Sequence, residues 1–374
     1  MGVKMKGYLK SLRSALPTLL LVGVFFFGPV LAQNDSVLGQ ADSFIVWSQQ
    51  GPNNTTHNGA IAYSPDGQLV ASGRADSNDV NIWNAADGTL VRTLNGQNNN
   101  ANVIAFSPNG QYLATGTGGG GQGLSLNLWR VSDGVRVVGR IGAFTNGTIS
   151  LSFSPDSQLL VASGFASESY KIYHVPDMTL VATVGNYNPD LGYNARIFAV
   201  AFSTDGQFIA VGQTRGIALR RASDGSLVRT INSNLPDVMK TTSLAFSPNG
   251  LYLASGVSNK DLTYGTCNDC SIKLFRIADG ALLHTYTNNN SVDDAKIGFS
   301  PNGRVIGAGY ADGSLHGGAA QFWVVSTEQT LRIDARPFWV QDFAFSRTGN
   351  TYAFFGADGV VAVARAPFLR GFNR

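Results

Sequence analysis

The sequence predicts an all-β fold of seven similar units, and three observations carry this prediction. The first is a motif of a small residue, an aromatic residue, Ser and a turn. It occurs seven times, with serines 43 to 53 residues apart, at Ser64, Ser107, Ser154, Ser203, Ser247, Ser300 and Ser346. The second is a later turn between two apolar runs, as at Asp87-Gly88. The third is composition: 44 Gly and 14% charged residues suit a turn-rich β domain. A repeat of this length, built from short strands, predicts a seven-bladed β-propeller of four-stranded antiparallel blades.

Each unit is expected to be a meander of strands a, b, c and d. In the first copy of the motif, Pro65 presets φ for a turn, Asp66 bonds its own backbone, and Gly67 supplies a positive φ before strand b. The aromatic residue before each Ser should pack between neighbouring blades. Two copies depart from the pattern, because Ser157 replaces the Gly of blade three and blade seven has no Pro. These two turns are expected to be the least well specified.

Residues 1–32 read as a secretory signal peptide, outside the propeller. Four basic residues precede the apolar run from Leu19 to Phe27, and small residues end at Ala32. The alternative is an uncleaved membrane anchor, although the run is short for a bilayer span, which needs about 20 residues. No Cys follows the expected cleavage site, which argues against a lipid-anchored lipoprotein. The protein is therefore expected to begin at Gln33 and to be secreted, periplasmic or at the cell surface.

The signal peptide accounts for the net positive charge of the chain. It holds four of the 27 Lys and Arg and no acidic residue, so 23 basic and 24 acidic residues remain, a formal charge of −1. Without a basic excess to neutralise phosphates, nucleic acid is not an expected partner.

The two ends of the repeat region are expected to complete one blade. Residues 33–42 read as a polar linker, and residues 43–374 as one propeller domain. The strand at Phe44–Trp47 has no a, b and c strands before it, whereas the last unit has no d strand. Residues 43–48 are therefore predicted to be the outer strand of the blade that contains Phe345, which closes the ring and removes a sheet edge.

The repeated segments resemble the WD-repeat propellers over about residues 43–366. The run Ala245-Phe246-Ser247-Pro248-Asn249-Gly250 followed by Leu253-Ala254-Ser255-Gly256 is similar to strands a and b of that family, and Trp83 and Trp129 are similar to the Trp of its Trp-Asp segment. Asn84 and Arg130 stand where the family has Asp, and Gly96-Gln97 stands where it often has Gly-His. The chain thus resembles an exported, bacterial-type variant with degenerate motifs.

No catalytic constellation is evident in the sequence. Gly116–Gly121 matches GxGxxG, but a strand follows where a dinucleotide site needs a helix, so we interpret it as a b–c loop. Cys267 and Cys270 are predicted to form a disulfide in an exported protein, with free thiols as the alternative. The four histidines lie in four different repeats, and the turn aspartates are explained by turn geometry. We expect neither a metal nor a cofactor.

Two functions from different classes are consistent with these observations. The first is a non-catalytic interaction scaffold, with a protein partner or, as a second ligand class, a glycan. The second is a propeller enzyme of lactonase-like or quinoprotein-like type. Loops rich in Asn, Gly, Ser and Thr favour the scaffold, since an enzyme of this shape would direct charged residues into its channel. Oligomeric state has no signature in the sequence.

The binding residues are expected on the face of the ring that carries the b–c and d–a loops. The a–b and c–d turns of the other face are nearly uniform, whereas these loops vary in length and composition, as functional loops on rigid scaffolds do. Large aromatic and Arg side chains are the usual anchors of interfaces. The candidate residues are Tyr187, Tyr193, Arg196, Tyr264, Arg336 and Trp339.

Overall fold

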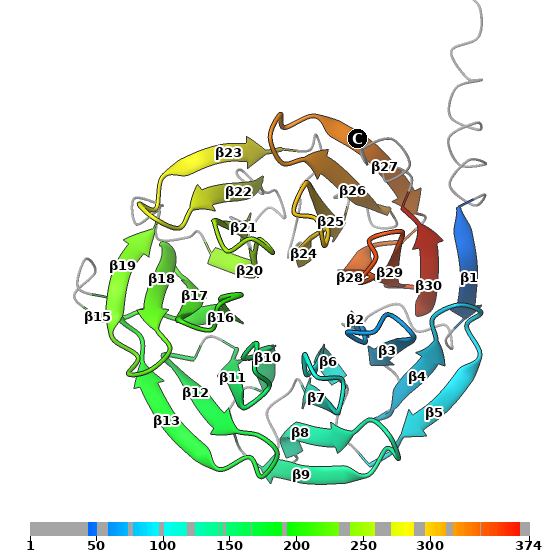
Figure 1. Cartoon of the computed structure of the whole chain (residues 1–374), viewed down its shortest axis with the longest axis horizontal. Helices are drawn as coiled ribbons and strands as arrows, with labels where there is room; N and C mark the ends of the chain where they lie inside the picture. Colours follow the sequence, from blue (N-terminus) through cyan, green and yellow to red (C-terminus); the bar gives the residue numbers. More distant parts are fainter. Residues whose placement is uncertain are drawn as a thin grey trace, which may run out of the picture.

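A computed structural model gives the fold of the chain. The structure describes residues 44–50, 59–73, 78–96, 101–117, 124–141, 143–144, 147–165, 167–188, 193–231, 240–258, 271–287, 296–311, 317–336 and 338–366. These residues form 30 β-strands in seven four-stranded sheets, with a two-stranded hairpin in addition. The sheets are arranged around a central axis as the blades of a propeller (Figure 1). The predicted all-β, seven-bladed fold is therefore confirmed. No helix in this described part is long and apolar enough to cross a membrane.

Six blades are consecutive meanders, and the seventh combines both ends of the chain. Blade 1 is β2 (Ala60–Tyr63), β3 (Leu69–Gly73), β4 (Val80–Asn84) and β5 (Leu90–Leu94); blade 2 is β6 (Ala101–Phe106), β7 (Tyr112–Thr117), β8 (Leu124–Arg130) and β9 (Arg136–Ile141); blade 3 is β10 (Thr148–Phe153), β11 (Leu159–Gly164), β12 (Ser169–His174) and β13 (Leu180–Gly185). Blade 4 is β16 (Ile197–Phe202), β17 (Phe208–Gln213), β18 (Gly216–Arg221) and β19 (Leu227–Ile231); blade 5 is β20 (Lys240–Phe246), β21 (Tyr252–Ser258), β22 (Ser271–Arg276) and β23 (Leu282–Tyr286). Blade 6 is β24 (Lys296–Phe299), β25 (Val305–Ala311), β26 (Gly318–Val324) and β27 (Thr330–Arg336); blade 7 is β28 (Val340–Phe345), β29 (Thr351–Gly356), β30 (Val360–Arg365) and β1 (Ile45–Gln50). The hairpin is β14 (Tyr187–Asn188) and β15 (Tyr193–Asn194), between blades 3 and 4.

The N-terminal strand β1 closes the ring, as the sequence predicts. It pairs antiparallel with β30, with Gln50 opposite Val360 and Trp47 opposite Val363. The strand begins and ends two residues later than the predicted 43–48, and an irregularity in pairing separates Ile45 from Trp47. Trp47 is buried between blades 7 and 1 and donates its indole N–H to the carbonyl of Ala85 at 2.9 Å. The outer strand of blade 7 is thus fixed to blade 1 as well as to its own sheet.

The repeated Ser motif builds the a–b turns by the same hydrogen bonds in blade after blade. In blade 1 the amide of Gly67 donates to the carbonyl of Ser64, and the hydroxyl of Ser64 accepts the amide of Leu69, both at 2.9 Å. Asp66 accepts the amide of Gln68 at 3.0 Å. The Ser157 turn is better defined than the sequence predicts. Ser157 takes φ 63°, as the Gly would, and its buried hydroxyl accepts the amide of Asn109 from blade 2.

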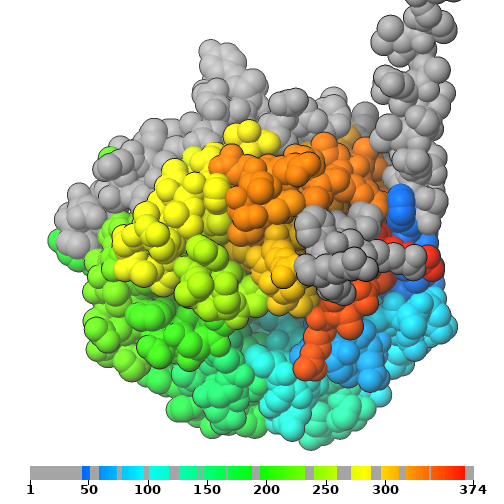
Figure 2. Space-filling model, turned by 45° about the horizontal axis from the view of Figure 1, so that its top comes forward, coloured from blue at the N-terminus to red at the C-terminus, as the bar shows by residue number. Residues whose placement is uncertain are grey.

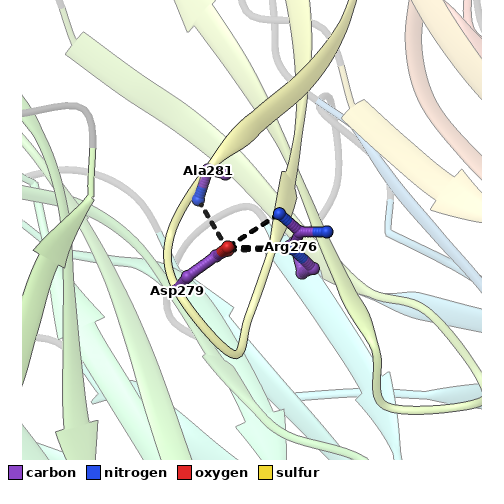
Figure 3. A network of polar contacts seen from close by, with 3 residues as sticks. All are labelled: Arg276, Asp279 and Ala281. Carbon is purple, nitrogen blue, oxygen red and sulfur yellow. Dashed lines mark hydrogen bonds and ion pairs between the residues drawn. The ribbon is translucent and has the colours of Figure 1, made fainter.

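The c–d turns use their aspartates in the same structural way. In blade 5, Asp279 accepts the amide of Ala281 at 3.1 Å and pairs with the Arg276 guanidinium at 2.7 Å (Figure 3). The hydrogen bond from Arg276 is the main cause that lowers the pKa of Asp279 to about 2. Arg130 and Asp133 form the corresponding ion pair in blade 2, at 2.6 Å. These carboxylates hold turns, which agrees with the interpretation of the turn aspartates from the sequence.

Among the described residues the core is divided into seven apolar clusters, one at each boundary between neighbouring blades. The aromatic residue of each Ser motif belongs to such a cluster or packs against one, as at Phe153, Phe202 and Phe345. Blades follow one another around the ring in sequence order, and blade 7 meets blade 1 (Figure 2). The a strands therefore line the central channel, while the connections between strands form the two faces.

Candidate interaction surface

The predicted binding residues that the structure describes lie on the face formed by the b–c and d–a connections, which we call the loop face. The opposite face, formed by the a–b and c–d turns, is the turn face. Tyr187 is 55% exposed in the hairpin between blades 3 and 4, and Arg196 is exposed just after that hairpin. Trp339 is 40% exposed on the connection from blade 6 to blade 7. Blades 4 and 7 are not neighbours in the ring, so these residues form two separate groups.

Several other predicted residues lie wholly or partly outside the described part. Tyr264, Cys267 and Cys270 belong to residues 259–270, which the structure does not describe, so the predicted disulfide stays a prediction. Tyr193 is described through its backbone, which pairs with Asn188.

The hairpin that carries Tyr187 is held by a buried polar residue. The backbone amide of Asn186 donates to the carbonyl of Glu168, and the amide of Ala195 donates to the carbonyl of Asn186. The Asn186 side chain donates to the carbonyl of Ala195 at 3.0 Å and to the Gln213 side chain at 2.6 Å. Asn186 and Gln213 are fully buried. Because buried polar groups cost free energy unless they are hydrogen-bonded, this network fixes the base of the hairpin in one arrangement.

A buried arginine completes this anchor. Arg220 on β18 donates to the carbonyl of Tyr187 at 2.9 Å and to the carbonyl of Gly225 at 3.0 Å. Burial lowers the pKa of the Arg220 guanidinium. Removing a cation from water is expensive, so its hydrogen bonds to these carbonyls must compensate for lost hydration. The d–a connection between blades 3 and 4 is therefore a built element that presents the Tyr187 side chain to solvent.

An aromatic and cationic cluster lies closer to the channel, because β16 borders the channel whereas the hairpin lies at the outer edge of the ring (Figure 1). Phe165, 53% exposed on the b–c connection of blade 3, meets Phe198 of β16 edge to face, with ring centroids 6.3 Å apart. The Lys240 ammonium of blade 5 lies 5.6 Å from the Phe198 ring centroid, within the range of a cation–π contact. Arg196 precedes Phe198 by two residues, and its carbonyl accepts the amide of Thr214. We name Phe165, Tyr187, Arg196, Phe198 and Lys240 the loop-face patch.

The second group of predicted residues is more deeply packed. The Arg336 guanidinium lies 4.6 Å from the centroid of the Phe354 ring. Nearby, Arg332 pairs with buried Asp334, which also accepts the hydroxyl of buried Tyr352. Burial is the main cause that raises the pKa of Tyr352. Arg336 therefore serves the packing between blades 6 and 7, and on this connection Trp339 is the more exposed side chain.

The central channel carries a set of polar contacts between neighbouring a strands. Ser152 accepts the amide of Phe202 and Ser243 that of Ile297. Asp342 accepts the amide of Ile61 at 2.8 Å. Burial raises the pKa of Asp342 to about 6, while the positive charge of Lys296 opposes that rise. These side chains satisfy backbone groups at the inner edge of each blade, and the space they line is about 210 Å³.

A large pocket lies on the turn face, between blades 5 and 6. Its volume is about 520 Å³, and its lining includes Leu283 and His284 of blade 5 and Val324 and Leu331 of blade 6. The sequence predicts a uniform turn face, so the pocket is a difference from expectation. Within the described part, no group of three His, Cys, Asp or Glu side chains is placed to hold a metal.

The comparisons with known proteins agree with this fold. The family model described as "WD domain, G-beta repeat" matches residues 54–84, 88–129 and 225–276. Together with the seven blades, these matches define the class of propellers built from WD repeats. The chain is a seven-bladed β-propeller in which three segments match the WD repeat.

Curated relatives are similar at modest identity. Pre-mRNA-processing factor 19 homolog 2 of Arabidopsis thaliana is 28% identical over 41% of this chain and 27% of the relative. The guanine nucleotide-binding protein subunit beta of Oryza sativa subsp. japonica is 22% identical over 69% of this chain and 67% of the relative. A chain of the crystal structure of the mitotic checkpoint complex matches with a TM-score of 0.68 at 18% identity, over 86% of this chain and 95% of that one. The chain spans less than half the length of several relatives that it matches.

Proposed function

We propose that the protein is an exported protein-interaction scaffold that captures its partner on the loop-face patch. The observation that carries the proposal is the anchored hairpin at Asn186 and Tyr187. Burial of Arg220, Asn186 and Gln213 costs free energy, and their hydrogen bonds hold a connection that leaves Tyr187 in solvent. A connection that served only to link two blades would not need such an anchor.

The chemistry of the patch indicates what it would bind. Two exposed aromatic rings, Phe165 and Tyr187, offer apolar area, while Lys240 carries positive charge beside Phe198 and Arg196 is exposed on the same face. Glu168 is an exposed acid on the same face. Aromatic and Arg side chains are enriched among interface residues that dominate affinity. We therefore infer a protein partner with apolar side chains and acidic residues, and treat a glycan as the competing ligand class.

The relatives support a scaffold role at the coarse level. One of them is, by its name, the beta subunit of a guanine nucleotide-binding protein. WD repeats match in this chain and seven blades form a rigid ring, which is suited to holding several connections at fixed positions.

Partner capture is expected to depend on the patch. Phe165→Ala combined with Tyr187→Ala should reduce affinity at least about 30-fold, because truncating a central aromatic anchor typically costs about 2 kcal/mol or more. The measurement is quantitative mass spectrometry of proteins that co-purify with tagged wild-type and variant chains from the native source. A partner retained equally by this variant would contradict the proposal, as would recovery of a glycan in place of a protein.

The matched control removes the same kind of surface from the other face. Leu251 and Val135 are 57% and 50% exposed and lie in turns of the turn face. Leu251→Ala combined with Val135→Ala should leave capture unchanged. A further variant, Arg220→Met, keeps every exposed side chain of the patch but removes the anchor of the hairpin, so it should weaken capture. Its control is Arg221→Met, at the exposed neighbouring position, which should leave capture unchanged. Loss of capture in the Leu251 and Val135 variant alone would assign binding to the turn face.

Export is the second part of the proposal and rests on the pattern of residues 1–32. We expect N-terminal sequencing of the protein from its native source to begin at Gln33, and fractionation to recover it outside the cytoplasm. A chain that still begins at Met1 and sediments with membranes would instead support the uncleaved anchor. A cytoplasmic chain that begins at Met1 would contradict both.

A further inference from the structure

The pocket between blades 5 and 6 occurs where the repeat departs from its own rule. In most c–d turns a Gly with positive φ packs closely against the outer strand of the preceding blade. A Cβ at Gly88 would lie 2.6 Å from the Trp47 ring, and one at Gly134 would lie 2.4 Å from Arg92. Blade 6 has Glu328 at this position, with φ 59°. Its carboxylate lies 2.7 Å from Nδ1 of His284 on β23 and pairs with that ring nitrogen.

Blade 3 shows that a side chain at this position can fill the space. Met178 also replaces Gly, with φ 55°, but it is fully buried in the cluster between blades 2 and 3. Glu328 instead points to His284 at the rim, and about 520 Å³ remains open below it. Leu274, Leu283, Val305, Val324 and Leu331 provide most of the apolar lining, with Asn302 and Ser326 among the polar residues. In Figure 2 the yellow strands of blade 5 lie beside the orange strands of blade 6, where this pocket is placed by its lining.

We propose that this pocket binds residues 367–374 of the same chain. The described chain ends on the turn face, the face on which the pocket lies. β30 runs to the turn face, and the amide of the next residue, Ala366, donates to the carbonyl of Asn350 in the a–b turn of blade 7. Ala366 packs against the apolar cluster of blades 6 and 7, to which Val305 and Leu331 also belong. Both of these residues line the pocket, so the segment leaves the described structure on the same face and beside the same cluster.

The length of the segment is sufficient. Eight residues span at most about 26 Å when extended. Packed sheets lie about 10 Å apart, so a path across blade 6 requires on the order of 10 to 20 Å.

The composition of the segment matches the pocket. Phe372, six residues past Ala366, can reach that distance and supplies an apolar side chain for the apolar lining, while Arg370 and Arg374 supply positive charge. Glu328 at the rim keeps carboxylate lone pairs beyond the contact to His284, since a carboxylate accepts up to about four hydrogen bonds. An Arg guanidinium is the side chain best suited to a carboxylate in two-point contact. The chain thus carries a ligand for the pocket between its own blades 5 and 6, on the face opposite the loop-face patch.

A photo-cross-linker in the full chain tests this inference directly. Phe372 is replaced by benzoylphenylalanine, and illuminated protein is digested and mapped by mass spectrometry. Cross-links are expected to residues 282–286, 302–305 or 324–331 of the same chain. Mixing ¹⁵N-labelled and unlabelled protein separates links within one chain from links between two copies. Links to other parts of the ring, or only between copies, would overturn the proposal.

Two neighbouring residues on β23 provide a matched pair for the same assay. Leu283 lines the pocket, whereas Leu282 is exposed on the other side of the strand. Leu283→Glu should reduce the cross-link yield about tenfold, because it places a charge among apolar side chains, while Leu282→Glu should leave the yield unchanged. Glu328→Gln, which keeps the shape of the rim, should reduce the yield about threefold through loss of the Arg contact. Equal yields in Leu283→Glu, Glu328→Gln and wild type, with folding verified by circular dichroism, would show that the segment does not use this pocket.

Discussion

Deletion of residues 33–50 should open the ring and lower its stability more than any single substitution in β1. The deletion removes β1, so β30 becomes an exposed sheet edge and the outer surface of blade 7 loses Trp47. The contact between blades 7 and 1 depends on that side chain, because Trp47 packs against Trp83 at 6.4 Å between ring centroids and bonds the carbonyl of Ala85. We expect a lower melting temperature by differential scanning calorimetry, together with aggregation through the new edge.

A single substitution separates the role of Trp47 from that of the strand as a whole. Trp47→Ala should cost about 3 to 5 kcal/mol, the range for deleting a buried aromatic side chain. Val46→Ala is the control, since Val46 is exposed on the same strand, and it should change stability by no more than about 0.5 kcal/mol. Equal melting temperatures for the parent and the deleted chain would refute closure of the ring by β1.

Replacement of Asp342 by Asn should change how stability depends on pH. Burial raises the pKa of Asp342 to about 6, although two backbone amides, of Ile61 and Phe343, donate to its oxygens. In the unfolded chain the carboxyl has its ordinary pKa near 3.8. The folded protein therefore binds a proton that the unfolded chain does not bind between about pH 4 and 6. Its stability should rise as pH falls through this window, by on the order of 2 to 3 kcal/mol.

Asp342→Asn keeps an oxygen for the Ile61 amide and removes the titration. Denaturant unfolding of wild type and variant at pH 7, 5 and 4 isolates the contribution of Asp342 as the difference between the two curves. Asp279→Asn is the control, because Asp279 gives a pH dependence of stability with the opposite sign. The hydrogen bond from Arg276 lowers the pKa of Asp279, so the stability that this carboxylate contributes is lost as pH falls below about 4. If the free energy of unfolding changed by the same amount between pH 7 and pH 4 in Asp342→Asn and in the wild type, this assignment for Asp342 would be contradicted.

The fold could be predicted from the sequence because its determinants are local and repeated. A turn such as Ser64 to Gly67 is specified by residues within five positions of each other, and seven copies give the blade count directly. The closing strand was predictable because the last unit has no d strand of its own, whereas the strand at residues 44–47 has no a, b and c strands before it. The boundaries of β1 were less predictable, since its pairing with β30 joins residues more than 300 positions apart.

The surface features depend on contacts that no local pattern contains. Arg220 holds Tyr187 across 33 positions, and Phe165, Phe198 and Lys240 come from three different blades. The sequence marked Tyr187 and Arg196 through composition, but it held no signal for Phe165, which follows an ordinary b strand. Glu328 was visible as a departure from Asp-Gly, yet the pocket beside it follows from the pairing with His284, 44 positions away. The Ser157 turn shows the same limit, because its hydroxyl is used by blade 2.

The two ends of the ring leave it together. The amide of Arg365 donates to the carbonyl of Phe44 at 2.8 Å, and the turn that follows Arg365 is on the turn face. A group joined to either end of the described chain is therefore attached on the turn face, opposite the loop face. A ring tethered to a surface, a resin or a fused protein through residues before Phe44 or after Ala366 would turn Phe165 and Tyr187 outward, away from the point of attachment. The pairing of β1 with β30, which completes blade 7, therefore also sets the orientation of a tethered ring.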